Sequence, residues 1–205
     1  MAINDKKYWD QFYQDNLIEK PSPFAQFCQE NYLTKKYRLL ELGSGSGRDL
    51  CFFHTVGHQV TGYDTSTEAV NMVTAANPGL DYQNGDFTAL THIESIEAIY
   101  SRWTIHSIDD EAAERVLDWV SCELEEGGLF LVEARTVNDG LFGEGTPVGR
   151  NAFVTDHYRR FLVVDEFRKE IVDRGFEIIF EKESNGFSVY KGDDPVLLRL
   201  VARKI

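Results

Sequence analysis

The chain has 205 residues, 42% of them hydrophobic, and a net charge of −13. This length and composition predict a single domain over residues 1–205 with one substantial core. No segment approaches the roughly 18 consecutive apolar residues of a membrane span, and the first residues lack the apolar region of a signal peptide. The acidic balance argues against nucleic acid as a partner, because that binding depends on a dominant basic face.

The spacing of cysteines and histidines gives no sign of a disulfide framework or a metal site. The three cysteines are widely separated and form no Cys-x-x-Cys pair, so reduced thiols in the cytoplasm are the simplest interpretation. His54 and His58 lie at a metal-like interval, but no cysteine or second histidine pair joins them, and Gly57 breaks the helix that would align them. We therefore expect a cytoplasmic protein with no metal.

Two helices are predicted before the first strand, at residues 6–16 and 22–32, and they form a helical cap over residues 1–34. The first of them carries aromatic residues at helical spacing: Tyr8, Trp9, Phe12 and Tyr13. This spacing is typical of a helix that packs its aromatic face on the rest of the domain.

A buried strand is predicted at residues 37–41, and it runs into three alternating glycines, Gly43, Gly45 and Gly47. Glycine reaches positive φ at little cost and lets main-chain N–H groups approach a ligand closely. A dinucleotide fingerprint would need a third glycine at the position that holds Arg48. The loop therefore favours a nucleotide-like cofactor of a different kind.

The second predicted strand, residues 59–63, leads into Asp64. This acid follows the first glycine by about 20 residues, where a carboxylate accepts hydrogen bonds from both ribose hydroxyls. Thr65 and Glu68 form a predicted capping box for the next helix, so that helix does not need Asp64 as its cap. We therefore expect Asp64 to bind a ribose.

The rest of the chain continues to alternate strands and helices. Further strands are predicted at residues 80–83, 96–100, 128–134, 176–180 and 196–201. Helices are predicted near residues 109–125, closed by Gly127 and Gly128, and near residues 165–174. This order predicts an α/β fold with a doubly wound, mostly parallel sheet.

Residues 136–158 are rich in Gly, Asn and Asp and show almost no periodicity. A loop of that length inside a compact domain is usually a lid or a binding loop. It follows the fifth strand, so it would overhang the carboxyl edge of the sheet, where ligands of such folds bind. We assign residues 136–160 to a loop that forms the substrate site.

Basic and histidine side chains gather around this predicted edge: Arg102, His106, Arg135, Arg150, His157, Arg159 and Arg160. In an acidic chain such a set favours a small anionic substrate, because guanidinium matches phosphate and carboxylate groups. For each single arginine the alternative is an ordinary surface ion pair. The expected substrate-binding residues are Arg102, Arg135, Arg150, Tyr158 and Arg159.

The Glu-x-Gly-x-Gly-x-Gly spacing from Glu41 to Gly47 resembles motif I of class I S-adenosylmethionine-dependent methyltransferases. The resemblance implies a Rossmann-like sheet of about seven strands with an antiparallel C-terminal strand. It also implies S-adenosylmethionine as cofactor and S-adenosylhomocysteine as product. In that family the acid helps to organise the ammonium end of the cofactor.

The same resemblance extends the cofactor site beyond the glycine loop. Asp86 and Phe87 stand where the family holds adenine, and the first helix often closes over the cofactor, which adds Tyr8 and Trp9. The expected cofactor-binding residues are Glu41, Gly43, Ser44, Gly45, Gly47, Arg48, Asp64, Thr65, Asp86, Phe87, Ser101, Tyr8 and Trp9.

Longer stretches look like a bacterial group encoded in capsule and O-antigen clusters, which methylates phosphate-type groups on surface polysaccharides or their precursors. They are Ser22-Pro23-Phe24-Ala25, Gly47-Arg48-Asp49, the segment from Tyr100 to His106, Glu133-Ala134-Arg135, His157-Tyr158-Arg159-Arg160-Phe161 and Asp194-Pro195-Val196. This similarity implies a small anionic acceptor, for example a nucleotide- or sugar-linked phosphate or a phosphoramidate. It leaves the oligomeric state open.

The acceptor decides which residues are catalytic. An ionised phosphate oxygen needs no strong base, so Arg102 and the histidines would mainly orient it. A sugar or metabolite hydroxyl needs a base, and His106 or His157 is then the candidate, because histidine titrates near neutral pH. A third alternative is a non-catalytic protein that keeps the cofactor pocket.

Overall fold

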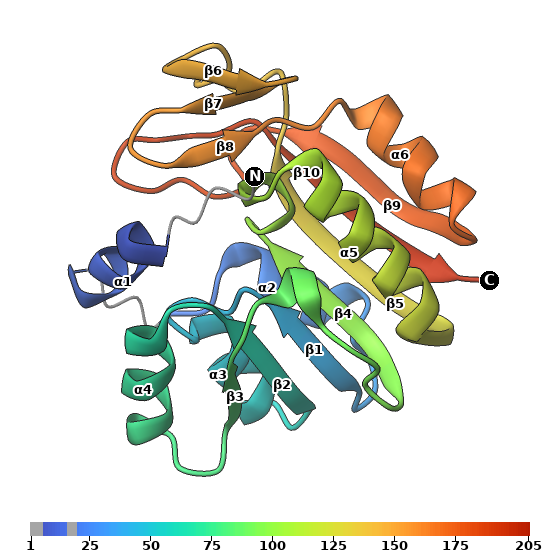
Figure 1. The fold of residues 1–205 in the computed structure, drawn as a ribbon. Coiled ribbons are helices and arrows are strands. Elements are labelled where there is room, and N and C mark those ends of the chain that lie inside the picture. Colours follow the sequence, from blue (N-terminus) through green and yellow to red (C-terminus); the bar gives the residue numbers. More distant parts are fainter. Residues whose placement is uncertain (1–5, 16–19) are drawn as a thin grey trace.

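The computed structural model describes residues 6–15 and 20–205. Its main sheet has seven strands in the order β3–β2–β1–β4–β5–β10–β9 (Figure 1). The strands are β1 (Arg38–Leu42), β2 (Gln59–Asp64), β3 (Asp81–Asn84), β4 (Ile96–Arg102), β5 (Leu124–Arg135), β9 (Phe176–Ser184) and β10 (Leu197–Lys204). β10 is antiparallel to both β5 and β9, and the pairs among β1 to β5 are parallel. The predicted fold class is confirmed.

Helices cover both faces of the sheet, and each face has its own apolar core (Figure 1). α2 (Pro23–Asn31), α3 (Arg48–Thr55) and α4 (Thr67–Ala76) cover one face, and α5 (Asp110–Glu123) and α6 (Val164–Asp173) cover the other. Alternation along β1 serves both cores, because Leu39 faces the α2–α3 side while Leu40 and Leu42 face α5. The strands are therefore buried on both faces, as parallel strands in such folds are.

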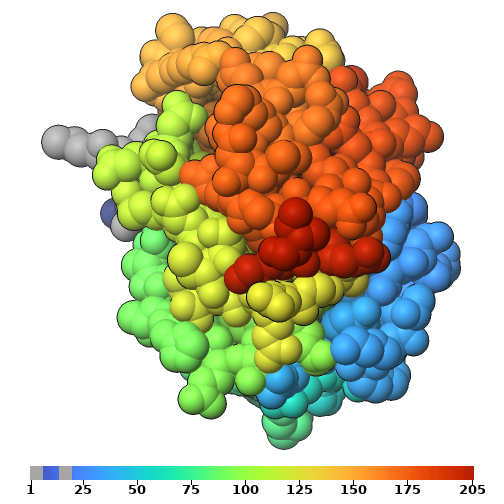
Figure 2. All heavy atoms as spheres, turned by 90° about the vertical axis from the view of Figure 1, so that its right-hand side faces the viewer, coloured from blue at the N-terminus to red at the C-terminus, as the bar shows by residue number. Residues whose placement is uncertain are grey.

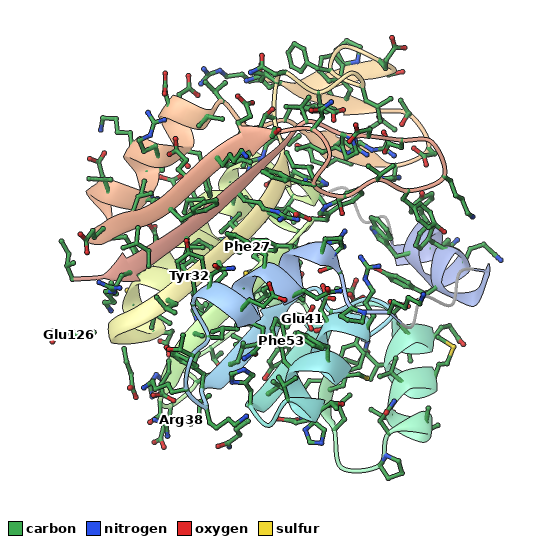
Figure 3. The ribbon with its side chains drawn as sticks, turned by 180° about the vertical axis from the view of Figure 1, so that it is seen from behind. Phe27, Tyr32, Arg38, Glu41, Phe53 and Glu126 are labelled. Carbon is green, nitrogen blue, oxygen red and sulfur yellow. The ribbon has the colours of Figure 1, made fainter. Side chains whose placement is uncertain are left out.

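The helix α2 lies beside the far edge of the sheet as well as over its face. Phe27 and Tyr32 reach Phe180 of β9, with ring centroids 5.0 and 6.1 Å apart (Figure 3). From the side, the orange and red segments that include α6, β9 and β10 form one mass next to the blue segment that includes α2 (Figure 2). No helix of the described ranges 6–15 and 20–205 is long and apolar enough to cross a membrane.

The stretch predicted as a loop over residues 136–160 contains a small antiparallel sheet. Its strands are β6 (Thr146–Gly149), β7 (Ala152–Val154) and β8 (Tyr158–Arg160), in that order. The prediction missed them because they are short and β6 is exposed at every residue, so no alternation of polar and apolar residues marks it.

Two predicted helix signals are wrong. The cap of α4 is Ser66, whose hydroxyl accepts the N–H of Ala69, and not Thr65. α5 ends at Glu123, and the chain passes directly into β5 at Leu124. Gly127 and Gly128 therefore lie within a strand, next to an irregularity in its pairing with β4, and do not close the helix.

Candidate active site

A cavity of about 850 Å³ opens at the carboxyl edge of the parallel strands. It is lined by the loop after β1, the ends of β2, β4 and β5, the small sheet and the helix α1 (Lys6–Asp15). Ligands of open α/β sheets bind at this edge. The volume lies toward the upper end of the roughly 300–1,000 Å³ that is typical of small-molecule pockets.

The glycine loop after β1 has the conformation that its sequence predicts. Gly43, Gly45 and Gly47 have φ values of +68°, +53° and +70°. A Cβ atom on Gly45 would collide with the Tyr13 hydroxyl, and one on Gly43 would collide with Thr104. The loop thus brings bare backbone against α1 and the β4 end, which only glycine permits. Gly43 and Gly45 line the cavity, whereas Gly47 lies behind the loop against Val73.

Asp64 is fixed at the end of β2 by two backbone N–H groups. Gly45 donates to Oδ2 and Ser66 donates to Oδ1, both at 2.8 Å. The carboxylate is buried yet lines the cavity beside Thr65. These two bonds hold the carboxylate rigidly at the wall of the cavity.

Glu41 is a buried carboxylate with an unpaired oxygen. Its Oε2 atom has no hydrogen-bond partner among the described residues, and the side chain lines the cavity. Figure 3 shows it in the interior, while Arg38 lies at the outer end of the same strand. Burial, and then the charge of Asp49, hold the pKa of Glu41 well above its usual value. Such a group suits a bound cation, and the ammonium of S-adenosylmethionine fits that need.

The predicted adenine side also lines the cavity. Asp86 starts a short 3₁₀ turn, η1 (Phe87–Ala89), and its Oδ1 accepts from the N–H and the hydroxyl of Thr88. Phe87 is partly buried against the core on the α5 side of the sheet. Both residues, together with Ser44 and Arg48, line the same cavity.

The helix α1 forms a roof that reaches both ends of the cavity. On one side Asp10 accepts a hydrogen bond from Ser66, and Tyr13 lies against Gly45. On the other side the Tyr8 hydroxyl donates to Asp156 at 2.9 Å, and the rings of Tyr8 and Trp9 lie 4.4 and 5.0 Å from His157. Tyr8 and Trp9 line the cavity.

The structure brings together most of the predicted substrate residues. Arg102, His106, Arg135, His157, Tyr158 and Arg159 all line the cavity. Three predicted site residues do not: Gly47, as described above, Arg150 and Ser101. Arg150 is exposed, pairs with Glu166 and borders a separate cleft between α5 and α6. Ser101 is fully buried and bonds the Thr104 hydroxyl at 2.6 Å, so it supports the β4 end from behind.

The arginines of the cavity each have a carboxylate partner. Arg102 Nε lies 3.1 Å from Glu133, Arg135 Nη1 lies 2.9 Å from Asp139, and Arg159 Nη1 lies 2.8 Å from Asp156. Burial would lower the pKa of Arg102, but the charges of Glu133 and Asp49 raise it above its usual value. Arg160 is structural, since it donates to the carbonyls of Ile105 and Ile108 and pairs with Asp110.

The two histidines have different surroundings. His106 Nδ1 accepts the backbone N–H of Arg135 at 3.1 Å. Burial, and then the charge of Arg135, hold its pKa well below the usual value, so the ring is neutral and carries its proton on Nε2. His157 Nδ1 lies 3.2 Å from Asp156. His106 is therefore a fixed hydrogen-bond donor, whereas His157 lies next to a carboxylate.

Several residues of the site escaped the sequence prediction. Glu133 lies in the apolar part of β5. The one feature of the sequence that could have marked it as a site residue is the presence of an acid in an apolar run. Tyr13 resembles a packing residue until the loop glycine beside it is known. Trp103 has a φ of +63° although it is not glycine, and its ring lies 4.9 and 5.0 Å from the guanidinium carbons of Arg102 and Arg135. Side-chain pairing of this kind depends on tertiary structure.

Comparisons with known proteins agree with this geometry. Residues 40–132 match the family model of a methyltransferase domain. A structure from Methanosarcina mazei, titled as a SAM-dependent methyltransferase, has a TM-score of 0.75 at 19% identity and covers 86% of this chain and 96% of that chain. An S-adenosylmethionine-dependent methyltransferase from Mesorhizobium loti has a TM-score of 0.69 at 21% identity, covering 88% and 98%.

A third similar structure contains ligands. It is the 1,6-didemethyltoxoflavin-N1-methyltransferase of Burkholderia thailandensis with 1,6-didemethyltoxoflavin and S-adenosylhomocysteine bound. Its TM-score is 0.74 at 16% identity, covering 97% of this chain and 86% of that chain. No curated protein sequence matches the chain. Residues 40–132 thus carry a methyltransferase domain, and the whole chain has the fold of these S-adenosylmethionine-dependent methyltransferases. The matched domain and the fold together support an S-adenosylmethionine-dependent methyltransferase with S-adenosylmethionine as its cofactor.

Proposed function

We propose that this methyltransferase transfers the methyl group to a small anionic acceptor of the phosphate or phosphoramidate type. The supporting observation is a set of hydrogen-bond donors in the cavity that have no protein acceptor among the described residues. They include Arg102 Nη1, Arg159 Nη2, the Nε2–H of His106 and the buried Nε of Arg135. Such donors match an acceptor that already carries negative charge.

The cofactor site is proposed to use residues from both halves of the fold. Glu41 would face the ammonium group, Asp64 the ribose, and Asp86 and Phe87 the adenine. When bound, S-adenosylmethionine supplies a methyl group on a positively charged sulfur. The α1 roof with Tyr8 and Trp9 would exclude water from the space between the two ligands.

The protein's contribution to transfer is alignment. An in-line displacement requires acceptor oxygen, methyl carbon and leaving sulfur on one axis, and positioning supplies much of the rate gain. Arg102 and Arg159 would hold the acceptor's non-reacting oxygens, and His106 would donate a hydrogen bond. No proton has to leave an ionised phosphate oxygen, so none of these groups acts as a base.

The biological setting is proposed to be capsule or surface polysaccharide synthesis, in the cytoplasm, on a soluble nucleotide- or sugar-linked precursor. The support is the resemblance of several stretches, including Tyr158 and Arg159, to the capsule and O-antigen group. Neighbouring genes for capsule assembly would support this setting, and a genomic context without any would contradict it.

A second candidate is O-methylation of a sugar or metabolite hydroxyl. It is favoured by one observation, the 3.2 Å approach of His157 Nδ1 to Asp156. A nearby carboxylate stabilises the positive charge that an imidazole gains when it accepts a proton, as a base must. His106 does not suit that role, because its Nδ1 already accepts a hydrogen bond and its Nε2 carries the proton.

Labelled methyl transfer separates these functions. We would incubate the protein with methyl-labelled S-adenosylmethionine and three matched compounds: phenyl phosphate, phenyl phosphoramidate and phenol. An anionic acceptor predicts label in the first two and none in phenol. Label in phenol alone would contradict it and support the hydroxyl reaction. Tight cofactor binding without any transfer would favour a non-catalytic cofactor-binding protein.

A further inference from the structure

The partly buried guanidinium of Arg102 and the buried guanidinium of Arg199 share a single carboxylate near the end of β5. Glu133 is completely buried, and its Oε1 accepts from Arg102 Nε at 3.1 Å while its Oε2 accepts from Arg199 Nε at 2.8 Å. Among the described residues Arg199 has no second carboxylate, because its remaining contacts are the Phe187 carbonyl and the rings of Phe24, Phe27 and Phe187. The three groups together carry one excess positive charge.

Glu133 also fixes the chain around Arg102. The indole N–H of Trp103 donates to Glu133 Oε1 at 3.1 Å, and the backbone N–H of Trp103 donates to the Glu133 carbonyl at 2.8 Å. These two bonds hold Trp103 at its left-handed φ of +63°, a conformation that a tryptophan adopts only under constraint. Trp103 is thereby held in this conformation, and it fixes the backbone directly after Arg102 at the end of β4.

The remaining contacts of Arg102 leave one side of its guanidinium toward the cavity. Nη2 donates to the Ser188 hydroxyl at 2.9 Å, and Nε is held by Glu133, so Nη1 is the group left over. Asp49, whose charge also acts on Arg102, is occupied by Ser22 and Tyr100 and lies 3.9 Å from Arg48. The charge of Arg102 acts in turn on the buried carboxylate of Glu41. A buried excess charge is costly unless it is paired.

We infer that Glu133 is a positioning residue that directs Arg102 Nη1 at the acceptor, and that the acceptor's anionic group is the missing counter-ion of the Arg102–Glu133–Arg199 cluster. This inference rests on the proposed function and deepens it, because it assigns the recognition of negative charge to one arginine and one buried acid. It also gives Arg102 a rigid fork, whose hydrogen bonds cost little side-chain entropy on binding.

Calorimetry on the protein saturated with S-adenosylhomocysteine tests the role of Glu133, with phenyl phosphate as the probe. We would compare the parent with two variants. Glu133→Gln removes the charge that holds Arg102 Nε, and Ser188→Ala removes the hydroxyl that accepts a hydrogen bond from Arg102 Nη2. Glu183→Gln is the matched control, because Glu183 contacts Asn138 away from the cluster. The expected result is about tenfold weaker phosphate binding in Glu133→Gln and about threefold weaker binding in Ser188→Ala, from the loss of charge-assisted hydrogen bonds.

The sign of the change is decisive. Removing an acid adds net positive charge, so a purely electrostatic role predicts tighter phosphate binding, whereas positioning predicts weaker binding. Tighter or equal binding in Glu133→Gln, with parental affinity for S-adenosylhomocysteine, would overturn the inference and leave the proposed function intact. If Glu133→Gln does not fold, Ser188→Ala tests the positioning of Arg102 alone, because it removes a neutral acceptor of Arg102 Nη2, and parental phosphate binding in that variant would overturn the inference. If the folded parent binds S-adenosylhomocysteine but no phenyl phosphate, the proposed function falls, and this inference falls with it.

Discussion

Single residues of this site behave differently from their ordinary chemistry because the fold buries them. His106 illustrates this, because one backbone N–H from Arg135 determines its tautomer, and burial keeps it neutral. A histidine in the sequence suggests a base, but in this position it is a donor. The distinction is invisible in the sequence, since it depends on a contact between residues 29 apart.

The lowered pKa of His106 predicts how stability depends on pH. In the unfolded chain the imidazole binds a proton below pH ~6.5, while in the folded protein it stays neutral to lower pH. The unfolded state therefore binds more protons in acid, and His106 makes the parent lose stability as pH falls below about 6.5. Denaturation of His106→Gln from pH 8 to 5 is expected to show a shallower loss than the parent. His92→Gln, at an exposed histidine, is the control, and identical slopes for parent and His106→Gln would contradict the assignment.

Most of the cofactor half could be predicted from local sequence, because backbone conformation and strand ends are local properties. Glu41, Gly45 and Asp64 lie where the glycine spacing and the strand pattern put them. The acceptor half could be predicted only as a set of residue types. Arg102 and Arg159 line the cavity, but Arg150 does not, and nothing in its sequence context separates it from them.

At the scale of elements, the long apolar strands were predictable and the small sheet was not. β4 and β5 are buried on both faces and stand out as apolar runs. β6 has no buried residue, so its pairing with β7 is set by contacts that the sequence pattern does not carry. The consequence bears on the site, because the β7–β8 turn, with Asp156 and His157, carries the partners of α1.

The contact between α1 and the glycine loop predicts a specific sensitivity. In Gly45→Ala the new methyl group meets the Tyr13 hydroxyl, at a φ of +53°. The left-handed conformation alone costs about 1–2 kcal/mol, and displacement of α1 should weaken binding of S-adenosylhomocysteine at least about tenfold. Gly140→Ala is the matched control, because a Cβ there meets no atom. Calorimetry and thermal unfolding measure both effects. Parental cofactor affinity in folded Gly45→Ala would show that α1 does not help to hold the cofactor.

For the whole molecule, the distribution of charge matters more than its sum. The chain has a net charge of −13, and Asp109, Asp110, Glu111 and Asp193 line the same cavity as the arginines. At long range the protein repels an anion, and at short range Arg102 and Arg159 attract it. The acidic balance therefore excludes a large polyanion such as duplex nucleic acid more strongly than it excludes a small one that enters the cavity.

This arrangement predicts an unusual dependence on salt. The Debye length falls from about 30 Å at 0.01 M to about 8 Å at 0.15 M ionic strength, so added salt screens the long-range repulsion. The side chain of Arg102 is only 16% exposed, and its attraction at contact is screened much less. We expect kcat/KM for phenyl phosphate to rise severalfold over that range, whereas a neutral acceptor would show no trend. A fall in kcat/KM with salt would mean that the field at the cavity mouth is attractive to anions, and that the acids there do not govern the approach of the acceptor.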